Sequence, residues 1–163
     1  AGRHLREHCE LLPSLLRTPA LARAEGASRA AARELMHRVG LDAWLDARAD
    51  SMPYGALKRL EIARALALEP KVLLLDEPAA GLNQTEAREI DALIRDLARG
   101  GMTVLLVEHN MRLVMEVSDR VLVLDRGARL AEGTPAEVAH DERVIEAYLG
   151  VADGADVVET ADA

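Results

Sequence analysis

The chain has 163 residues, half of them apolar, and its 20 basic and 28 acidic side chains give it a formal charge of -8. That length suffices for one domain with a sizeable core, and the apolar fraction argues against a disordered chain. A surface of this charge repels a phosphate backbone, so we expect no nucleic acid among the partners.

Cysteine usage and hydropathy point to the cytosol. The lone Cys9 excludes an internal disulfide and fits a reducing compartment. No apolar run approaches the roughly 18 residues that span a bilayer, and the first residues lack the pattern of a signal peptide. We therefore expect a cytosolic protein, which can still dock on a membrane protein.

The first 50 residues or so are predicted to be helical, and they contain no strand-like run. Residues 20–38 are rich in Ala, Arg, Leu and Glu, which favour a helix, and Gly40 stands where that helix should end. Pro13 and Pro19 are expected to break the preceding part into short pieces.

The middle of the chain alternates helix and strand. A helix is predicted from Gly55 to about residue 68, because Pro70 stops it. Residues 71–76 form a short apolar run between prolines, which is typical of a strand buried on both faces. Residues 84–99 carry apolar side chains at helical spacing, which predicts an amphipathic helix.

The remainder continues this alternation. Strands are expected at residues 103–108 and 120–125, with a hairpin partner at 128–132, and helices around residues 111–115, after the capping-box sequence 134–137, and around 144–149. Beyond Gly150 the residues are acidic and small, and we expect a frayed tail. This alternation of strands and helices predicts an α/β fold with a mostly parallel sheet covered on both faces.

Two adjacent carboxylates, Asp76 and Glu77, end the first predicted strand. Side chains alternate along a strand, so the two cannot point to one face. Sheet enzymes bind ligands outside the carboxyl ends of such strands. One carboxylate there can hold Mg²⁺ and the other can orient an attacking water. The alternative is a strand that ends in two solvated acids.

Two further positions can bind an anion. His109 follows the second strand, where it can donate a hydrogen bond to a terminal phosphate or serve as a capping or surface residue. Gly55 opens a helix after residues 52–54, and the backbone N–H groups there can receive an anion. The alternative at Gly55 is a plain junction between loop and helix.

Together these segments resemble the ATP-binding cassette (ABC) ATPases over residues 11–150. Residues 52–66 resemble the signature motif and its helix, and residues 71–78 resemble the Walker B strand. Residues 79–83 resemble the D-loop, and His109 resembles the switch histidine.

The resemblance extends to the ATPases of branched-chain amino acid importers. Tyr54-Gly55 followed by Arg59-Leu-Glu-Ile-Ala-Arg64 is similar to that subfamily. Further segments that share the likeness are residues 11–19, 76–83, 108–115, 118–120, 133–137 and 144–150.

The resemblance implies the C-terminal part of a P-loop NTPase (RecA-like) core with a mostly parallel sheet, preceded by the ABC helical subdomain. Residues 1–55 would be the helical subdomain, ending in the altered signature motif. Residues 56–150 would be the part of the core that holds Walker B, D-loop and switch histidine, and 151–163 a flexible acidic tail.

Catalytic roles follow from the same resemblance. Asp76 would serve Mg²⁺, Glu77 would be the general base for the hydrolytic water, and His109 would contact the γ-phosphate of ATP.

The resemblance also assigns residues to a subunit interface, because these ATPases work as head-to-tail dimers. Pro53, Tyr54 and Gly55 would meet ATP bound on the partner subunit. Gly81, Leu82 and Asn83 would lie along the dimer interface.

The implied function is the ATP-hydrolysing subunit of an importer for branched-chain or related amino acids, with ATP and Mg²⁺ as cofactors. Its partners would be a second ABC ATPase subunit, membrane permease subunits and, indirectly, a solute-binding protein. It would sit on the inner face of the plasma membrane. The leucine-rich residues 11–16 would touch a membrane partner, or else fill the helical subdomain.

The chain departs from the family pattern by an absence. The phosphate-binding loop, Gly-x-x-x-x-Gly-Lys-Ser/Thr, has no match, because Lys58 and Lys71 are the only lysines and neither lies in such a loop. The glutamine loop is missing too. We expect both upstream of Ala1, and we expect the chain to be inactive alone.

The signature motif itself is altered. Pro53 stands for the usual Ser, Tyr54 for the first Gly and Ala56 for the usual Gln. Pro53 offers neither a hydroxyl nor an N–H, which changes the contact with the partner's ATP. Asn83 replaces the usual Asp and can cap a helix, with Glu86 three residues on.

Two other functions stay open. A chain without its phosphate loop can be an incomplete module that docks on a permease or a partner ATPase without turnover. It can also belong to an ABC ATPase that works away from transport, although the long insertions or tandem cassettes usual there are not visible.

Overall fold

The computed structural model describes residues 19–149, and the chain falls into two compact units, residues 1–107 and 108–163. The described elements of unit 1 are α2 (Pro19–Arg38), the short 3-10 helices η1 (Asp42–Trp44) and η2 (Ala49–Ser51), α3 (Tyr54–Leu66), β1 (Val72–Asp76), α4 (Gln84–Arg99) and β2 (Thr103–Val107). Those of unit 2 are α5 (Met111–Val117), β3 (Val121–Asp125), β4 (Ala128–Gly133), α6 (Pro135–Ala139) and α7 (Glu142–Leu149).

Helix α2 ends where the sequence predicts. Gly40 has a φ of +70°, a conformation that glycine adopts at little cost, and the chain turns back there. The Leu41 amide donates to the Met36 carbonyl at 2.8 Å, which closes the helix end. Val39 and Leu41 are buried on either side of this turn and join the core of unit 1.

Helix α4 also matches its predicted bounds. Asn83 caps it by accepting hydrogen bonds from the Thr85 and Glu86 amides, and the Glu86 carboxylate accepts from the Asn83 amide, so the capping box is complete. The predicted apolar face is buried, with Ile90 and Leu97 at 0% and 1% exposure.

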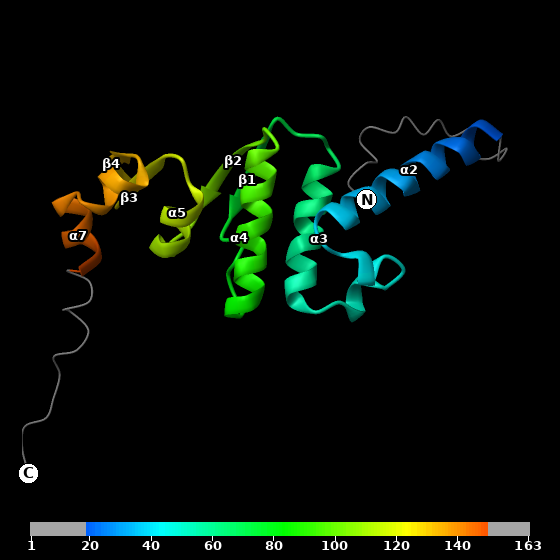
Figure 1. Cartoon of the computed structure of the whole chain (residues 1–163), viewed down its shortest axis with the longest axis horizontal. Helices are drawn as coiled ribbons and strands as arrows, with labels where there is room; N and C mark the ends of the chain where they lie inside the picture. The colour runs from blue at the N-terminus through cyan, green and yellow to red at the C-terminus, as the bar shows by residue number, and fades with distance from the viewer. Residues whose placement is uncertain (1–18, 150–163) are drawn as a thin grey trace, which may run out of the picture. The chain divides into compact units, whose positions relative to one another are not determined.

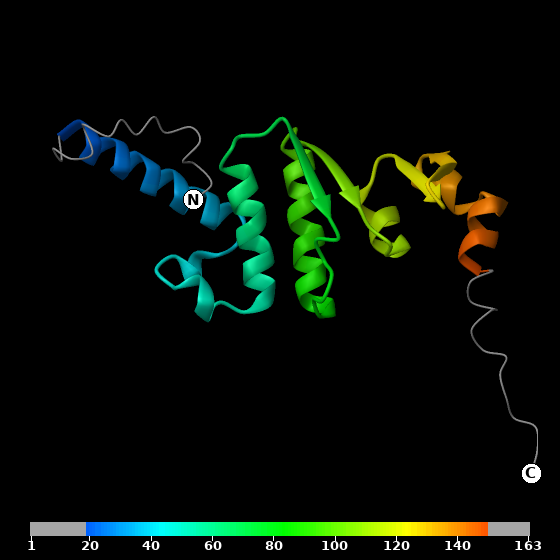
Figure 2. The same ribbon diagram turned by 180° about the vertical axis from the view of Figure 1, so that it is seen from behind.

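Strands β1 and β2 form a parallel pair in which Leu74 lies opposite Leu105. Figure 1 shows α4 beside this pair, and Figure 2 shows the two strands from behind as neighbouring arrows. Leu73 is buried at 3% exposure on the face that joins the core of unit 1.

The other face of the pair is open, with Leu74 exposed at 69% and Leu105 and Val107 at 56% each. The prediction of a strand buried on both faces is therefore wrong for the described residues. A two-stranded pair with helices on one face leaves alternate side chains without a covering layer.

Unit 2 is built around an antiparallel hairpin, as predicted. Arg126 and Gly127 both have positive φ, 47° and 80°, which is the geometry of a tight hairpin turn between β3 and β4. Its small core consists of Val121, Val123, Ala131, Val138 and Val144.

Within the described residues the parallel pair and the hairpin are two separate two-stranded sheets. The capping box at the start of α6 is confirmed, because Thr134 accepts from the Glu137 amide and Glu137 accepts from the Thr134 amide. Helices and strands together confirm the α/β class.

No helix between residues 19 and 149 is long and apolar enough to cross a bilayer. The predictions for Pro13, residues 11–16 and the tail at 151–163 lie outside the described residues. The domain boundary predicted after residue 55 stays a prediction.

Candidate functional site

The end of strand β1 holds the predicted carboxylate pair. Asp76 is the last strand residue and is exposed, and Glu77 follows it, also exposed. Glu77 has a φ of +43°, a left-handed conformation that a non-glycine residue adopts at a cost of about 1–3 kcal/mol. Its amide donates to the Val107 carbonyl at 2.9 Å. The backbone at Glu77 is therefore anchored to the sheet while the chain turns away from it.

Two consecutive turns lead from Glu77 to helix α4. The Ala80 amide donates to the Glu77 carbonyl at 3.1 Å, and the Leu82 amide donates to the Ala79 carbonyl at 3.2 Å. Gly81 has a φ of +76°, which its lack of a side chain permits. Asn83 then caps α4, which confirms the capping role considered for it. This is the segment that the sequence likens to a D-loop.

The start of α3 has no such cap. Pro53 is the N-cap residue, with φ −65° and ψ 158°, and makes no side-chain hydrogen bond to the helix. Tyr54 is half exposed, at 53%, and Gly55 is buried. Because no side chain of the helix start satisfies the first amides, they suit an acceptor from outside, such as a phosphate oxygen. The Lys58 ammonium lies 5.6 Å from the centre of the Tyr54 ring, in reach of a cation–π interaction.

The start of α3 meets the turn before α4. A Cβ at Gly55 would lie 2.6 Å from Glu86 Oε1, and a Cβ at Gly81 would lie 3.2 Å from Tyr54 Cε1. The structure thus brings together residues 53–55 and 81–83, which the sequence predicted as two separate parts of the interface. The only signal in the sequence was a glycine at each crowded point.

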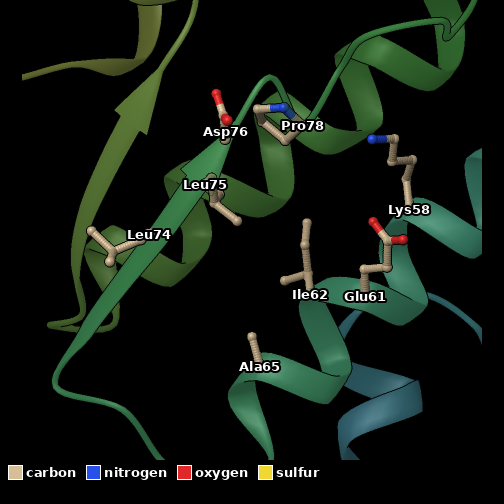
Figure 3. Close-up of a pocket in the computed structure, with 8 residues that line it drawn as sticks. All are labelled: Lys58, Glu61, Ile62, Ala65, Leu74, Leu75, Asp76 and Pro78. Atoms are coloured by element: carbon tan, nitrogen blue, oxygen red, sulfur yellow. The ribbon is translucent and has the colours of Figure 1, made fainter.

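A small groove lies between α3 and β1 (Figure 3), with a volume of about 200 Å³. Charged side chains and an apolar floor share its lining of Lys58, Glu61, Ile62, Ala65, Leu74, Leu75, Asp76 and Pro78. Pockets that enclose a ligand usually measure about 300–1,000 Å³. The groove is smaller than this, so these residues do not form an enclosed pocket.

His109 belongs to unit 2 and is exposed. The neighbouring Asn110 caps α5, by accepting from the Leu113 amide at 3.3 Å. The cap is therefore Asn110 and not His109, and the phosphate contact predicted for His109 stays a prediction.

The donor set at the end of β1 suits a magnesium ion that is shared with a nucleotide. Among residues 19–149 no group of three or more His, Cys, Asp or Glu side chains could hold a metal ion by itself. Mg²⁺ in nucleotide sites takes one or two carboxylates and completes its shell with phosphate oxygens and water. The exposed carboxylate of Asp76 fits that arrangement.

Two family profiles match the chain. The family described as "ABC transporter" matches residues 3–80, and "Branched-chain amino acid ATP-binding cassette transporter" matches residues 128–154. These ranges contain the signature-like helix start and the carboxylate pair in the first case, and the hairpin strand β4 with α6 and α7 in the second.

Similar proteins agree with these matches. LivG of Salmonella typhimurium, named a high-affinity branched-chain amino acid transport ATP-binding protein, is 46% identical over 87% of this chain and 56% of its own length. BraF of Pseudomonas aeruginosa, with the same description, is 43% identical over 92% of this chain and 58% of its own length.

Among solved structures, a nucleotide-free ATP-binding cassette from an ABC transporter is similar with a TM-score of 0.71 and 27% identity, over 90% of this chain and 59% of that one. The chain thus spans little more than half the length of the proteins it matches.

Proposed function

We propose, on the premise that this chain belongs to the ABC transporter family of ATP-binding proteins, that it is the C-terminal part of an ATP-hydrolysing subunit that drives amino acid import. The solutes would be branched-chain or related amino acids, which LivG and BraF carry in their names. The fold agrees, since the similar solved structure is an ATP-binding cassette from an ABC transporter.

The observation that carries the proposal is the carboxylate pair at the end of β1. Asp76 and Glu77 stand at the carboxyl end of a parallel strand, where α/β proteins bind their ligands. The left-handed backbone of Glu77 is strain of the kind that collects at functional sites.

Each residue then has a distinct task. Asp76 would hold Mg²⁺, and the bound Mg-ATP supplies the phosphoryl group that is transferred to water. The Glu77 carboxylate would accept a proton from the attacking water. His109 would donate a hydrogen bond to the terminal phosphate, where negative charge accumulates.

A second subunit would complete the site. The uncapped start of α3 at residues 53–55 would face ATP on that subunit, and the turn at residues 81–83 would line the interface. The turn is accessible, because Gly81 and Asn83 are exposed. In the assembled transporter the subunit would rest on the permease at the inner face of the membrane, with the solute-binding protein acting from the other side.

The phosphate-binding loop would come from residues outside these 163, in the part of the relatives that the chain does not span. The open face of β1–β2 supports this proposal. Parallel sheets are covered on both faces, yet Leu74, Leu105 and Val107 stand exposed by more than half. Full burial of a Leu or Val side chain stabilises a fold by about 1.5–3 kcal/mol. A further layer of structure from residues outside these 163 would therefore be stabilised by packing on this exposed face.

The test uses the complete subunit, with its phosphate loop. Glu77→Gln should bind Mg-ATP as the parent does and hydrolyse it about 10²- to 10⁴-fold more slowly, since the amide cannot take a proton. Glu61→Gln, at another carboxylate of the groove, is the matched control and should keep the parent rate. Single-turnover hydrolysis by Glu77→Gln near the parent rate would remove Glu77 from the mechanism.

A second candidate function is a docking module without turnover. The 163 residues contain no Gly-x-x-x-x-Gly-Lys-Ser/Thr loop, which supplies most phosphate contacts in P-loop proteins. Calorimetry of this chain with Mg-ATP distinguishes the cases. We expect no binding by the chain alone and tight binding by the complete subunit; if the complete subunit also fails to bind, the docking function is the correct one.

A further inference from the structure

Two adjacent residues at the start of α3 pack against the turn and cap of α4. A Cβ at Gly55 would lie 2.6 Å from Oε1, 2.8 Å from Cδ and 3.1 Å from Cγ of Glu86. A Cβ at Gly81 would lie 3.2 Å from Tyr54 Cε1. Contacts below about 3.4 Å leave no room for a further atom. A side chain from the other segment therefore occupies the space beside each glycine, where a Cβ would otherwise lie.

The two contacts hold the α4 cap at both ends. Gly81 precedes the N-cap Asn83, and Glu86 follows it as the third helical residue. The Glu86 carboxylate also accepts a hydrogen bond from the Asn83 amide at 3.2 Å. Glu86 thus has two tasks, because it closes the capping box and it lies against α3.

The Tyr54 ring makes a surface contact and is not part of the core. It is 53% exposed, and Lys58 lies over it from one turn further along α3. A Cβ at Gly81 would approach one ring carbon closely, at 3.2 Å from Cε1, while the hydroxyl at 3.7 Å and Cζ at 3.8 Å would be at ordinary van der Waals distance. The closest approach is therefore made by the ring edge, which Tyr54→Phe retains.

We propose that Tyr54 is a positioning residue that holds the turn at residues 81–83 against the start of α3. Residues 53–55, which are proposed to meet the partner's ATP, would then move together with residues 81–83, which are proposed to line the dimer interface. This inference rests on the proposed function for its consequence in catalysis. Its structural part, the clamp between Tyr54 and Gly81, stands on the contacts alone.

The first experiment measures the clamp without reference to ATP. In the complete subunit, hydrogen exchange should be followed at the Leu82 amide, which donates to Ala79, and at the Asn83 amide, which donates to Glu86. Tyr54→Ala should speed exchange at both amides by at least about threefold, the lower range for residues in contact. Tyr54→Phe keeps the ring edge and should leave exchange unchanged.

The matched control is Arg64→Ala, an exposed position near the end of the same helix, which should not alter exchange at the turn. Exchange that is equal in Tyr54→Ala and in the parent overturns the proposal. That outcome is independent of ATP hydrolysis, so it leaves the proposed function intact.

The second experiment approaches the contact from the glycine. Gly81→Ala is strained by its φ of +76° and by the 3.2 Å approach to the ring, and Tyr54→Ala removes only the second cause. In a double-mutant cycle on steady-state ATP hydrolysis, Gly81→Ala should therefore lower kcat by a factor at least about three times smaller when Tyr54 is already Ala. KM should change little, and Gly81→Ala should lower kcat by the same factor in a Tyr54→Phe background as in the parent, because the ring edge is retained.

Two results of the cycle overturn the catalytic part of the inference. One is additivity of the two substitutions, and the other is a loss in Tyr54→Phe equal to that in Tyr54→Ala, which would assign the effect to the hydroxyl. If the complete subunit hydrolyses no ATP at all, the proposed function fails, and the exchange experiment still decides the clamp.

Discussion

Helices α4 and α6 begin with the same motif in different surroundings. Asn83 with Glu86 and Thr134 with Glu137 each form a complete capping box. At both helix starts the glutamate side chain lies close to a glycine. A Cβ at Gly55 would lie 2.6 Å from Glu86, and a Cβ at Gly133 would lie 2.8 Å from Glu137.

The origin of the glycine separates the two helix starts. Gly133 immediately precedes the cap residue Thr134, so the whole arrangement at α6 is local. Gly55 belongs to another helix, α3, and its contact with Glu86 is made only when the two helices pack together. The same capping box therefore fixes a helix end in one place, and in the other it also docks the segment proposed to meet the partner's ATP.

The largest expected effect comes from giving α3 the cap that it lacks. Pro53→Ser, in the complete subunit with its partner, adds a hydroxyl whose oxygen can accept from the helix start and whose hydrogen can be donated to ATP across the interface. A hydrogen bond to a charged group contributes roughly 1.5–3 kcal/mol. ATP-driven dimerisation should tighten by about tenfold to a hundredfold, measured by sedimentation with hydrolysis blocked by Glu77→Gln.

Pro53→Ala is the control for Pro53→Ser, because it removes the ring and adds no hydroxyl. It should leave the dimer constant near that of the parent. If serine and alanine tighten the dimer equally, the gain comes from loss of the proline. An unchanged constant with serine would mean that Tyr54 or the Gly55 amide already supplies the contact.

The next largest effect is expected from substituting the glycine at each of the two helix starts. Gly55→Ala should destabilise the complete subunit by about 1–2 kcal/mol, because the half-buried Glu86 must leave its capping position. Gly133→Ala should cause a smaller loss, since the exposed Glu137 carboxylate can rotate into solvent and only its Cβ, 3.2 Å from the new methyl group, stays close. Urea unfolding followed by circular dichroism measures both.

A second measurement repeats the glycine substitutions in a protein that already carries Glu86→Ala. With the carboxylate gone, Gly55→Ala should have almost no further effect, because the alanine methyl group then occupies vacated space. Equal losses at Gly55 and Gly133 would show that the long-range contact adds nothing to the local cap.

The smallest effect concerns the pH dependence of the local cap. Hydrogen bonds from the Thr134 backbone and hydroxyl lower the pKa of Glu137 from its ordinary 4.5. A carboxyl with a lowered folded-state pKa stabilises the fold fully above 4.5, and this contribution disappears as the pH falls through the folded pKa.

An NMR titration of the Glu137 carboxyl tests that direction. The parent should titrate below 4.5, and Thr134→Ala should raise the pKa only part of the way back, since the backbone bond from residue 134 survives. A Glu137 carboxyl that titrates at or above 4.5 in the parent would contradict the cap as described.

Local signals in the sequence predicted the elements well. Helix α4 begins at Gln84 and ends at Arg99, as its apolar spacing and flanking residues indicate. The hairpin and both capping boxes also appear where predicted. These features depend on residues within a few positions of one another, so the local sequence is enough to determine them.

Tertiary structure decided what those elements do together. The left-handed backbone of Glu77 has no marker in the sequence, because glutamate is not a residue that favours positive φ. The open face of β1–β2 was missed because an apolar run shows that a strand avoids water and does not show whether a second layer is present.

The sequence by itself determined the family resemblance, the order of helices and strands, and the identity of the candidate residues from Pro53 to His109. Only the folded chain showed that Tyr54 meets Gly81 and that Gly55 meets Glu86. Capping, helical periodicity and turn formation are local, and neighbouring residues set them. A contact between α3 and the turn before α4 depends on how two separate segments pack, and no spacing along the chain records that.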